Sequence, residues 1–193
     1  MKTLLGTLTM SFILATHVMG AGVVRQATPQ EIADKPELVV SAIRNQEAEK
    51  SAAIVVKALA AIQATKWSDA KKRQHSVALI TYAVAAKGNN AGPMMGLVAA
   101  AIPAASLPLV AATAVVAAGD NSPAVANAIV AAVANNTQSA EAARSACDSP
   151  TTVLLPTEVG TIRGTILPTP TQAPAKAPPL PTIIKGAEKY PGQ

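Results

Sequence analysis

Two similar stretches lie 31 residues apart in the most alanine-rich part of the chain. Ala83-Val-Ala-Ala-Lys-Gly-Asn-Asn90 is matched by Ala114-Val-Val-Ala-Ala-Gly-Asp-Asn121, so that Gly88 aligns with Gly119. Repeats of 20 to 50 residues are typical of structural units that each bury one face on the next. The match therefore predicts stacked helical hairpins in this part of the chain.

The same offset recurs a little farther along. Leu97-Val-Ala-Ala-Ala-Ile102 aligns with Ala128-Ile-Val-Ala-Ala-Val133. The alternative to a true repeat is that alanine-rich helices resemble each other by composition alone. Because the glycine and asparagine positions coincide as well, we favour the repeat and predict two copies, 76–106 and 107–137.

Glycine, asparagine and proline mark the turns of each copy. Glycine just past a helix readily takes the left-handed conformation, so both aligned glycines are predicted to end helices with positive φ. In the second copy, the asparagine or the serine after it caps the next helix, and proline opens that helix. The predicted structural turn residues are Gly88, Asn90, Gly119, Asn121 and Pro123.

The rest of the body also has helical patterns. Thr28-Pro-Gln-Glu31 is typical of a capping box at a helix start. A longer helix is expected from Pro36 to about Ala64, with a break near Asn45. Its expected packed face consists of Ile54, Val55, Ala58, Leu59 and Ile62. We predict an all-α fold of alanine-rich hairpin repeats with about six or seven helices, over residues 28–147.

Composition indicates how such a body is held together. Hydrophobic residues make up 50% of the 193 residues, but aromatic residues only 2%. Hydrophobic stabilisation scales with buried area, and alanine buries little. A core of Ala and Val must therefore depend on close approach of the helices.

The N-terminus is typical of a signal peptide. Lys2 precedes a mostly apolar run from Leu4 to Ala15, and small residues follow it. We predict a signal peptide over residues 1–20, cleaved after Gly20 or Ala21, and a secreted or periplasmic protein. An uncut membrane anchor is the alternative, but the apolar run is shorter than the ~20 residues that a span needs.

The composition changes near residue 148. Prolines and threonines dominate from there to residue 193, which predicts an extended or disordered tail with polyproline II character. Within it, the stretch Val159–Leu167 is expected either to form a short strand or to lie along the helical body. Pro178-Pro-Leu-Pro181 could dock in an aromatic groove, although a solvated spacer is favoured.

Catalytic and metal-binding patterns are not found in the sequence. After signal cleavage, His75 is the only histidine and Cys147 the only cysteine, too few for a nucleophile triad or a usual zinc site. We expect His75 to be exposed near a helix start. Phosphate-cradling glycine motifs are absent. We predict a protein that is not an enzyme, with no cofactor and no metal, and favour a free Cys147 thiol over a disulfide-linked dimer.

One basic run is the candidate for contact with an anionic surface. It consists of Lys66, Trp67, Lys71, Lys72 and Arg73. Proteins that stack on nucleic acid bases usually interleave several aromatic residues with the charge, whereas this run has one. We therefore expect a solvated helix face and no nucleic acid partner.

Two functions follow from these features. The first is an exported, non-enzymatic structural or protein-interaction protein with an unknown protein partner. The alternative is a membrane-associated protein embedded through Met94–Gly119, which contains no charged residue and is long enough to span. Its Gly92-x-x-x-Gly96 motif is of the kind that joins membrane helices. Pro103 and Pro108 within the segment favour the first reading.

Overall fold

The computed structural model describes residues 26–165, which form an all-α structure with no strand among them. The predicted fold class is thus confirmed. Seven of the helices have nine or more residues, and two shorter ones precede them. The helices are α1 (Pro29–Asp34), α2 (Val39–Ile43), α3 (Ala48–Ala64), α4 (Asp69–Lys87), α5 (Ala91–Ala101), α6 (Leu107–Ala118), α7 (Ser122–Ala132), α8 (Thr137–Asp148) and α9 (Pro156–Gly164).

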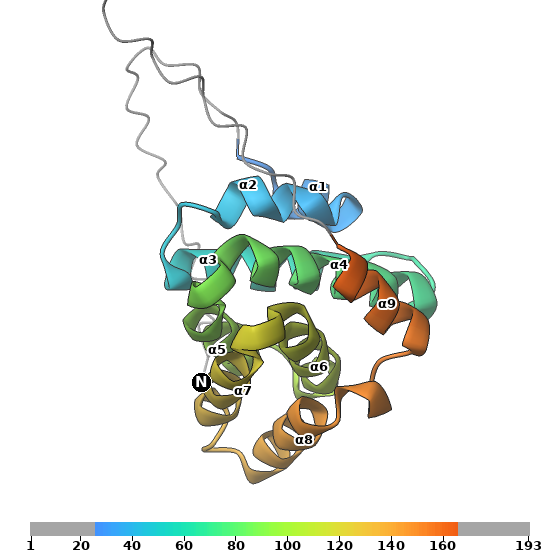
Figure 1. Cartoon of the computed structure of the whole chain (residues 1–193). Helices are drawn as coiled ribbons and strands as arrows, with labels where there is room; N and C mark the ends of the chain where they lie inside the picture. The colour runs from blue at the N-terminus through green and yellow to red at the C-terminus, as the bar shows by residue number, and fades with distance from the viewer. Residues whose placement is uncertain (1–25, 166–193) are drawn as a thin grey trace, which may run out of the picture.

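Helices α1 to α8 form two layers. Helices α1, α3, α5 and α7 contact one another in sequence in the first layer, and α2, α4, α6 and α8 do the same in the second. Figure 1 shows the resulting pairs stacked from α1 and α2 at the top to α7 and α8 at the bottom. Each pair buries its apolar faces on the next, which is the architecture of a helical-repeat stack. The predicted copies 76–106 and 107–137 correspond to most of α4 with α5, and to α6 with α7.

The turns of the two copies have the same backbone conformation. Gly88 has φ 51° and ψ −124°, and Gly119 has φ 54° and ψ −120°. The predicted positive φ is confirmed at both glycines, but the left-handed helical region has ψ of about +47°, so the expectation of that region is wrong. These angles instead match the first central residue of a type II′ turn, a region that glycine enters because it lacks a Cβ. Each glycine begins a single 3-10 turn, Gly88–Asn90 or Gly119–Asn121, that leads into the next helix.

The asparagine at the end of the second turn does not cap a helix with its side chain. Asn121 flanks α7, which begins at Ser122 with Pro123 in its first turn, and makes no side-chain cap bond. Its side-chain nitrogen instead donates to the carbonyl oxygens of Gly88 and Asn89, each at 3.4 Å. One turn is thereby joined to the equivalent turn of the preceding copy.

Close approach of α5 and α7 depends on two glycines. A Cβ on Gly96 would lie 2.9 Å from the carbonyl oxygen of Ala128, and one on Gly92 would lie 3.3 Å from that of Ala124. Helices at this separation can pack backbone against backbone with only small side chains between them. The Gly92-x-x-x-Gly96 motif therefore joins two helices of the same layer within the stack.

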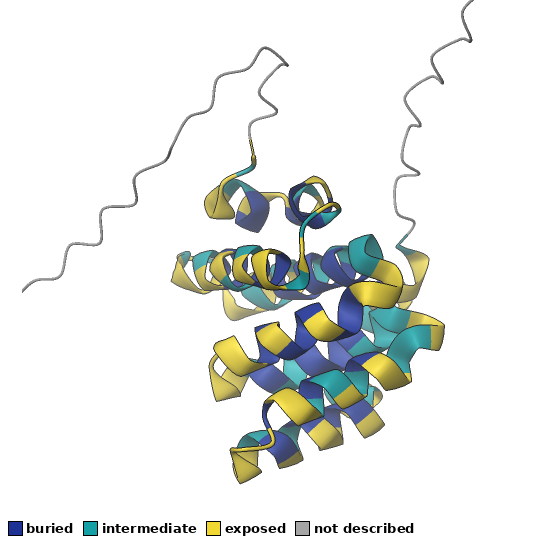
Figure 2. Cartoon of the chain, turned by 90° about the vertical axis from the view of Figure 1, so that its left-hand side faces the viewer, coloured by how far each residue is buried: buried dark blue, intermediate teal, exposed yellow. Residues whose placement is uncertain are grey.

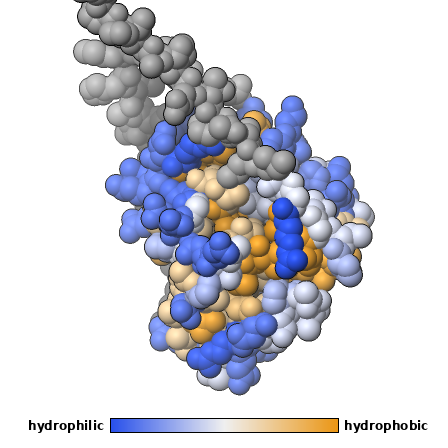
Figure 3. All heavy atoms as spheres, viewed as in Figure 1, coloured by the Kyte–Doolittle hydropathy of each residue, from blue (hydrophilic) through white to orange (hydrophobic). Residues whose placement is uncertain are grey.

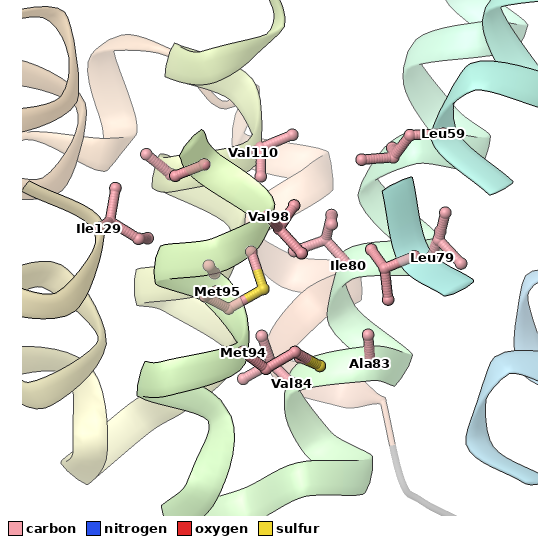
Figure 4. Packing of buried hydrophobic residues seen from close by; sticks show 14 of the residues in the cluster. Leu59, Leu79, Ile80, Ala83, Val84, Met94, Met95, Val98, Val110 and Ile129 are labelled. Carbon is pink, nitrogen blue, oxygen red and sulfur yellow. The ribbon is translucent and has the colours of Figure 1, made fainter. Parts of the chain in front are cut away.

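The core is continuous between the layers. Figure 4 shows buried side chains from several helices converging, among them Ile80, Met94, Val98 and Ile129. On α3, the expected face is buried at Val55, Ala58, Leu59 and Ile62, whereas Ile54 is only partly buried against the core.

The expectation of an extended tail from residue 148 is wrong for its first part. Residues 150–152 form a 3-10 turn and α9 follows. Residues 159–164 are therefore helical and not a strand, whereas the alternative expectation, that this stretch lies along the helical body, is confirmed for these residues. Leu154 and Ile162 are buried, and α9 packs on α4 and α6. Pro156 is tolerated because it occupies the first helical position, where no N–H partner is needed.

The predicted signal peptide, and the predicted tail beyond residue 165, lie outside the described residues.

Within residues 26–165, one segment is long and apolar enough to cross a membrane by length and composition, Ala104–Ala132. In the structure it is divided at Gly119–Asn121 into α6, of 12 residues, and α7, of 11 residues. The predicted membrane segment Met94–Gly119 likewise contains part of α5 and the whole of α6, with a turn around Pro103 between them. A helix of 12 residues is about 18 Å long, against the ~30 Å of a bilayer core.

Candidate functional site

The predicted basic run does not form a single charged surface. Lys66 and Trp67 lie in the turn before α4, and Lys71, Lys72 and Arg73 lie in its first turns. The Lys71 ammonium lies 4.2 Å from the centroid of the Trp67 ring, a cation–π geometry. The three cations of α4 have different surroundings, because successive residues of a helix point in different directions.

His75 is part of the same aromatic cluster, and the expectation that it is exposed is wrong. Its ring is half-buried, with its centroid 4.5 Å from that of Trp67. Its Nδ1 lies 2.8 Å from the carbonyl oxygen of Ala33 at the end of α1. This contact joins the first helix of the stack to α4, so the histidine has a structural partner 42 residues away.

Arg73 holds α9 in place. Its Nε lies 2.7 Å from Oε1 of Glu158, and its Nη2 lies 2.9 Å from Oε2 of the same residue. Nη2 also donates to the carbonyl oxygen of Val153 at 2.6 Å. The hydrogen bonds from Arg73 lower the pKa of the Glu158 carboxyl, and those to Glu158 raise the pKa of Arg73. Glu158 was not among the predicted site residues, because nothing in the sequence links two residues 85 positions apart.

A cavity of about 650 Å³ lies between α3, α4 and the connection from α5 to α6. Its apolar wall is contributed by three separate segments and includes Val56, Leu59, Ile102, Leu109 and Val110. The polar side chains that line it are Gln63, Asp69, Lys72, Arg73, Ser76 and Ser106. Cavities of this size with a few polar groups on an apolar wall are typical of sites for small molecules.

Two polar groups of this cavity stand out. Ser76 is 3% exposed, and its hydroxyl oxygen is buried with no hydrogen-bond partner among residues 26–165. Lys72, one helical turn earlier, is half-buried, and within the described part of the chain no carboxylate lies within ion-pairing distance of it. Of the predicted basic residues, Lys72 and Arg73 thus line the cavity, and Arg73 is already paired.

Cys147 is a buried free cysteine near the end of α8. Burial raises the pKa of its thiol to about 11, and the negative charge of Asp148 contributes in the same direction. The thiolate, the reactive form of cysteine, is therefore scarce at neutral pH. Across residues 26–165, no group of three or more His, Cys, Asp or Glu side chains is placed to hold a metal ion.

The outward face of the α5 and α7 layer is uncharged. Between Lys87 and Glu141 the sequence contains one charged residue, Asp120. Figure 2 looks onto this layer and shows exposed residues recurring along each helix. Six of the exposed residues on α5 and α7 are called the outer face here: Pro93, Leu97, Ala100, Ala124, Asn127 and Ala131. Leu97 is 42% exposed, and with Leu155 it is one of two exposed large hydrophobic residues in the described range.

Apolar residues also reach the surface on the side seen in Figure 3, where they gather along the middle of the face between hydrophilic residues. Soluble proteins usually keep about a quarter or more of their surface charged. Helices α5, α6 and α7 depart from this rule, because they carry no charged residue on either their buried or their exposed sides.

Comparison of the chain with protein-family models, with curated proteins and with solved structures found no match.

Proposed function

We propose that the chain is an exported, non-enzymatic helical-repeat protein that binds a partner protein through the outer face of α5 and α7. The observation that carries this proposal is the absence of charge on exposed positions of two adjacent helices, with Leu97 at the centre of one of them. Helical-repeat stacks commonly use extended surfaces of this kind for binding.

The proposed partner surface is apolar and low in charge. The outer face offers small side chains and few hydrogen-bonding groups, so that a flat apolar surface can approach it closely. A charged partner surface would lose solvation there without gaining an ion pair. The absence of charge thus favours a partner that also buries alanine, valine or leucine side chains.

A membrane surface is the alternative occupant of the same face. The composition of Ala104–Ala132 favours it. It is opposed by the division of that segment into two short helices and by the weak lipid affinity of alanine. A partner protein would be captured together with the chain, whereas a membrane would retain the chain. One set of outer-face variants therefore distinguishes the two occupants.

The test compares capture from the native host by the wild-type chain, by Leu97→Glu and by Ala131→Glu. Gln138→Glu is the matched control, since Gln138 is exposed on α8, outside the outer face. The proposal predicts one protein that is captured by wild type and by the control and is lost with both outer-face variants. Wild-type chain that stays in carbonate-washed membranes, with both outer-face variants released, would favour the membrane instead. Capture that is unchanged by all three variants would contradict the outer face as the binding surface.

A further inference from the structure

The cavity between α3, α4 and the α5–α6 connection is not accounted for by binding at the outer face. It lies on a different part of the stack from the outer face, and none of the outer-face residues lines it. Leu59 and Val110 form its apolar wall from opposite layers of the stack, and Figure 4 shows both side chains among the packed residues of the core. A volume of about 650 Å³ is within the ~300–1,000 Å³ usual for sites that enclose a small organic molecule.

The Ser76 hydroxyl is the first group that points to a ligand. The described residues contain four buried polar side chains, and the other three are hydrogen-bonded. Thr81 donates to the Val77 carbonyl at 2.8 Å, and Thr113 donates to the Leu109 carbonyl at 2.7 Å. Ser51 lies 3.4 Å from the Gln46 carbonyl. Only Ser76 lacks a partner, and only Ser76 of the four lines the cavity.

Lys72 is the second such group. It lies on the same face of α4 as Ser76, because residues four apart on a helix are neighbours. Arg73, the other cation that lines the cavity, is occupied by Glu158. Asp69, exposed at the start of α4, adds one negative charge to the cavity lining. The lining thus offers one free cation, and its acidic residue opposes an occupant with more than one negative charge.

We propose that this cavity binds a small aliphatic monocarboxylate. The aliphatic body lies against Leu59, Ile102 and Val110, and the carboxylate faces the Lys72 ammonium. A change of the Ser76 side-chain rotamer, which breaks no hydrogen bond of its hydroxyl, lets that hydroxyl donate to a carboxylate oxygen and gives it the partner that residues 26–165 do not supply. The ligand binds without covalent chemistry, and the site is independent of the outer face.

The first experiment measures binding of dodecanoate to the full chain by isothermal titration calorimetry. The expected result is saturable binding of one dodecanoate per chain. Ala105→Trp, at an exposed position that lines the cavity, should abolish it by filling the space. The matched control is Ala104→Trp, since Ala104 is also exposed but lies outside this cavity. No saturable binding, or binding that survives Ala105→Trp, would overturn the proposal.

The second experiment separates the charge from the apolar contact. Lys72→Gln should weaken dodecanoate about tenfold, as expected for loss of one partly buried ionic hydrogen bond. Lys71→Gln, the control, should change the affinity less than twofold, because Lys71 stacks on Trp67. Dodecanol should bind the wild-type chain about as weakly as dodecanoate binds Lys72→Gln. Equal affinity of wild type for dodecanoate and dodecanol would overturn the assignment of a carboxylate.

Ser76→Ala adds a readout that does not depend on the ligand. Removing a hydroxyl that has no partner should leave the melting temperature of the ligand-free chain unchanged or raise it. The same variant should weaken dodecanoate several-fold. A lower melting temperature with unchanged affinity would show that the hydroxyl has a structural partner and would overturn its role.

The capture experiment adds one further outcome. If the protein captured from the host is lost with Ala105→Trp while dodecanoate never binds, a protein occupies the cavity and the small-ligand proposal fails.

Discussion

The side-chain nitrogen of Asn121 lies 3.4 Å from the carbonyl oxygen of Gly88, so that one turn of the stack is bonded to the turn before it. The same nitrogen reaches the carbonyl of Asn89. On the same edge, Lys87 donates to the carbonyl oxygens of Ile43 and Gln46 in the turn between α2 and α3. Three successive turns are therefore joined by side chains that bond to backbone carbonyls.

Replacing Asn121 should loosen this edge. Asn121→Ala removes a donor shared by two carbonyls, and we expect a loss of about 0.5–1.5 kcal/mol in the free energy of unfolding. Asn90→Ala is the matched control, since Asn90 occupies the equivalent position one copy earlier and its side chain makes no hydrogen bond within residues 26–165. Urea unfolding followed by circular dichroism measures both. Equal losses for the two variants would mean that the bond between turns contributes nothing.

The turn glycines should be irreplaceable by any L-residue. Because ψ is near −120° rather than +47°, asparagine should gain nothing from its tolerance of the left-handed region. We expect Gly88→Val and Gly88→Asn each to cost more than ~1 kcal/mol, and Gly119 to behave alike. Thermal melts check this, and an Asn variant as stable as wild type would contradict the observed turn geometry.

The packing of α5 on α7 leads to a graded prediction. Gly96→Ala places a Cβ 2.9 Å from the Ala128 carbonyl, and we expect overpacking to cost about 1–3 kcal/mol. Gly92→Ala should cost less, because the corresponding distance is 3.3 Å. Gly160→Ala, on α9 with nothing within 4 Å of the added Cβ, should instead stabilise the chain by up to ~1 kcal/mol through helix propensity. Denaturant midpoints would refute the packing if Gly96→Ala were neutral.

The Arg73–Glu158 pair makes the docking of α9 depend on pH. The pKa of Glu158 is lowered in the folded chain, so its stabilisation is complete above the unfolded pKa of ~4.3 and is lost as pH falls through the folded pKa. At pH 7, Glu158→Gln should cost about 1–3 kcal/mol. The difference between wild type and variant should shrink below pH ~4. Glu141→Gln, at an exposed site on α8, is the control and should have little effect at either pH. A constant gap from pH 7 to pH 3 would contradict the ionic role of the pair.

The sequence indicated the stack because its signals are local. Each repeated glycine lies beside the helix that it ends, and the 31-residue offset is visible without any knowledge of tertiary contacts. The helix α9 was missed because proline-rich composition suggested an extended tail, although its first proline occupies a position that helices tolerate. Composition averaged over a segment conceals a single turn or helix.

The cavity could not be predicted, because its walls come from segments far apart in the chain. Leu59 and Val110 are ordinary apolar helix residues, and Ser76 resembles any other helical serine. What distinguishes Ser76 is the absence of a hydrogen-bond partner, a property of the packed structure. Lys72 was identified only as one member of a basic run, whereas its neighbours on α4 make different contacts.

The most direct test of the binding function is photo-crosslinking in the native host from one position of the outer face. The substitution is Leu97→p-benzoylphenylalanine, and Gln138→p-benzoylphenylalanine on α8 is its control. The proposed function predicts one discrete protein adduct from position 97 that is absent at position 138. Crosslinks from position 97 to lipid alone, or the same faint products from both positions, would contradict a protein partner on the outer face.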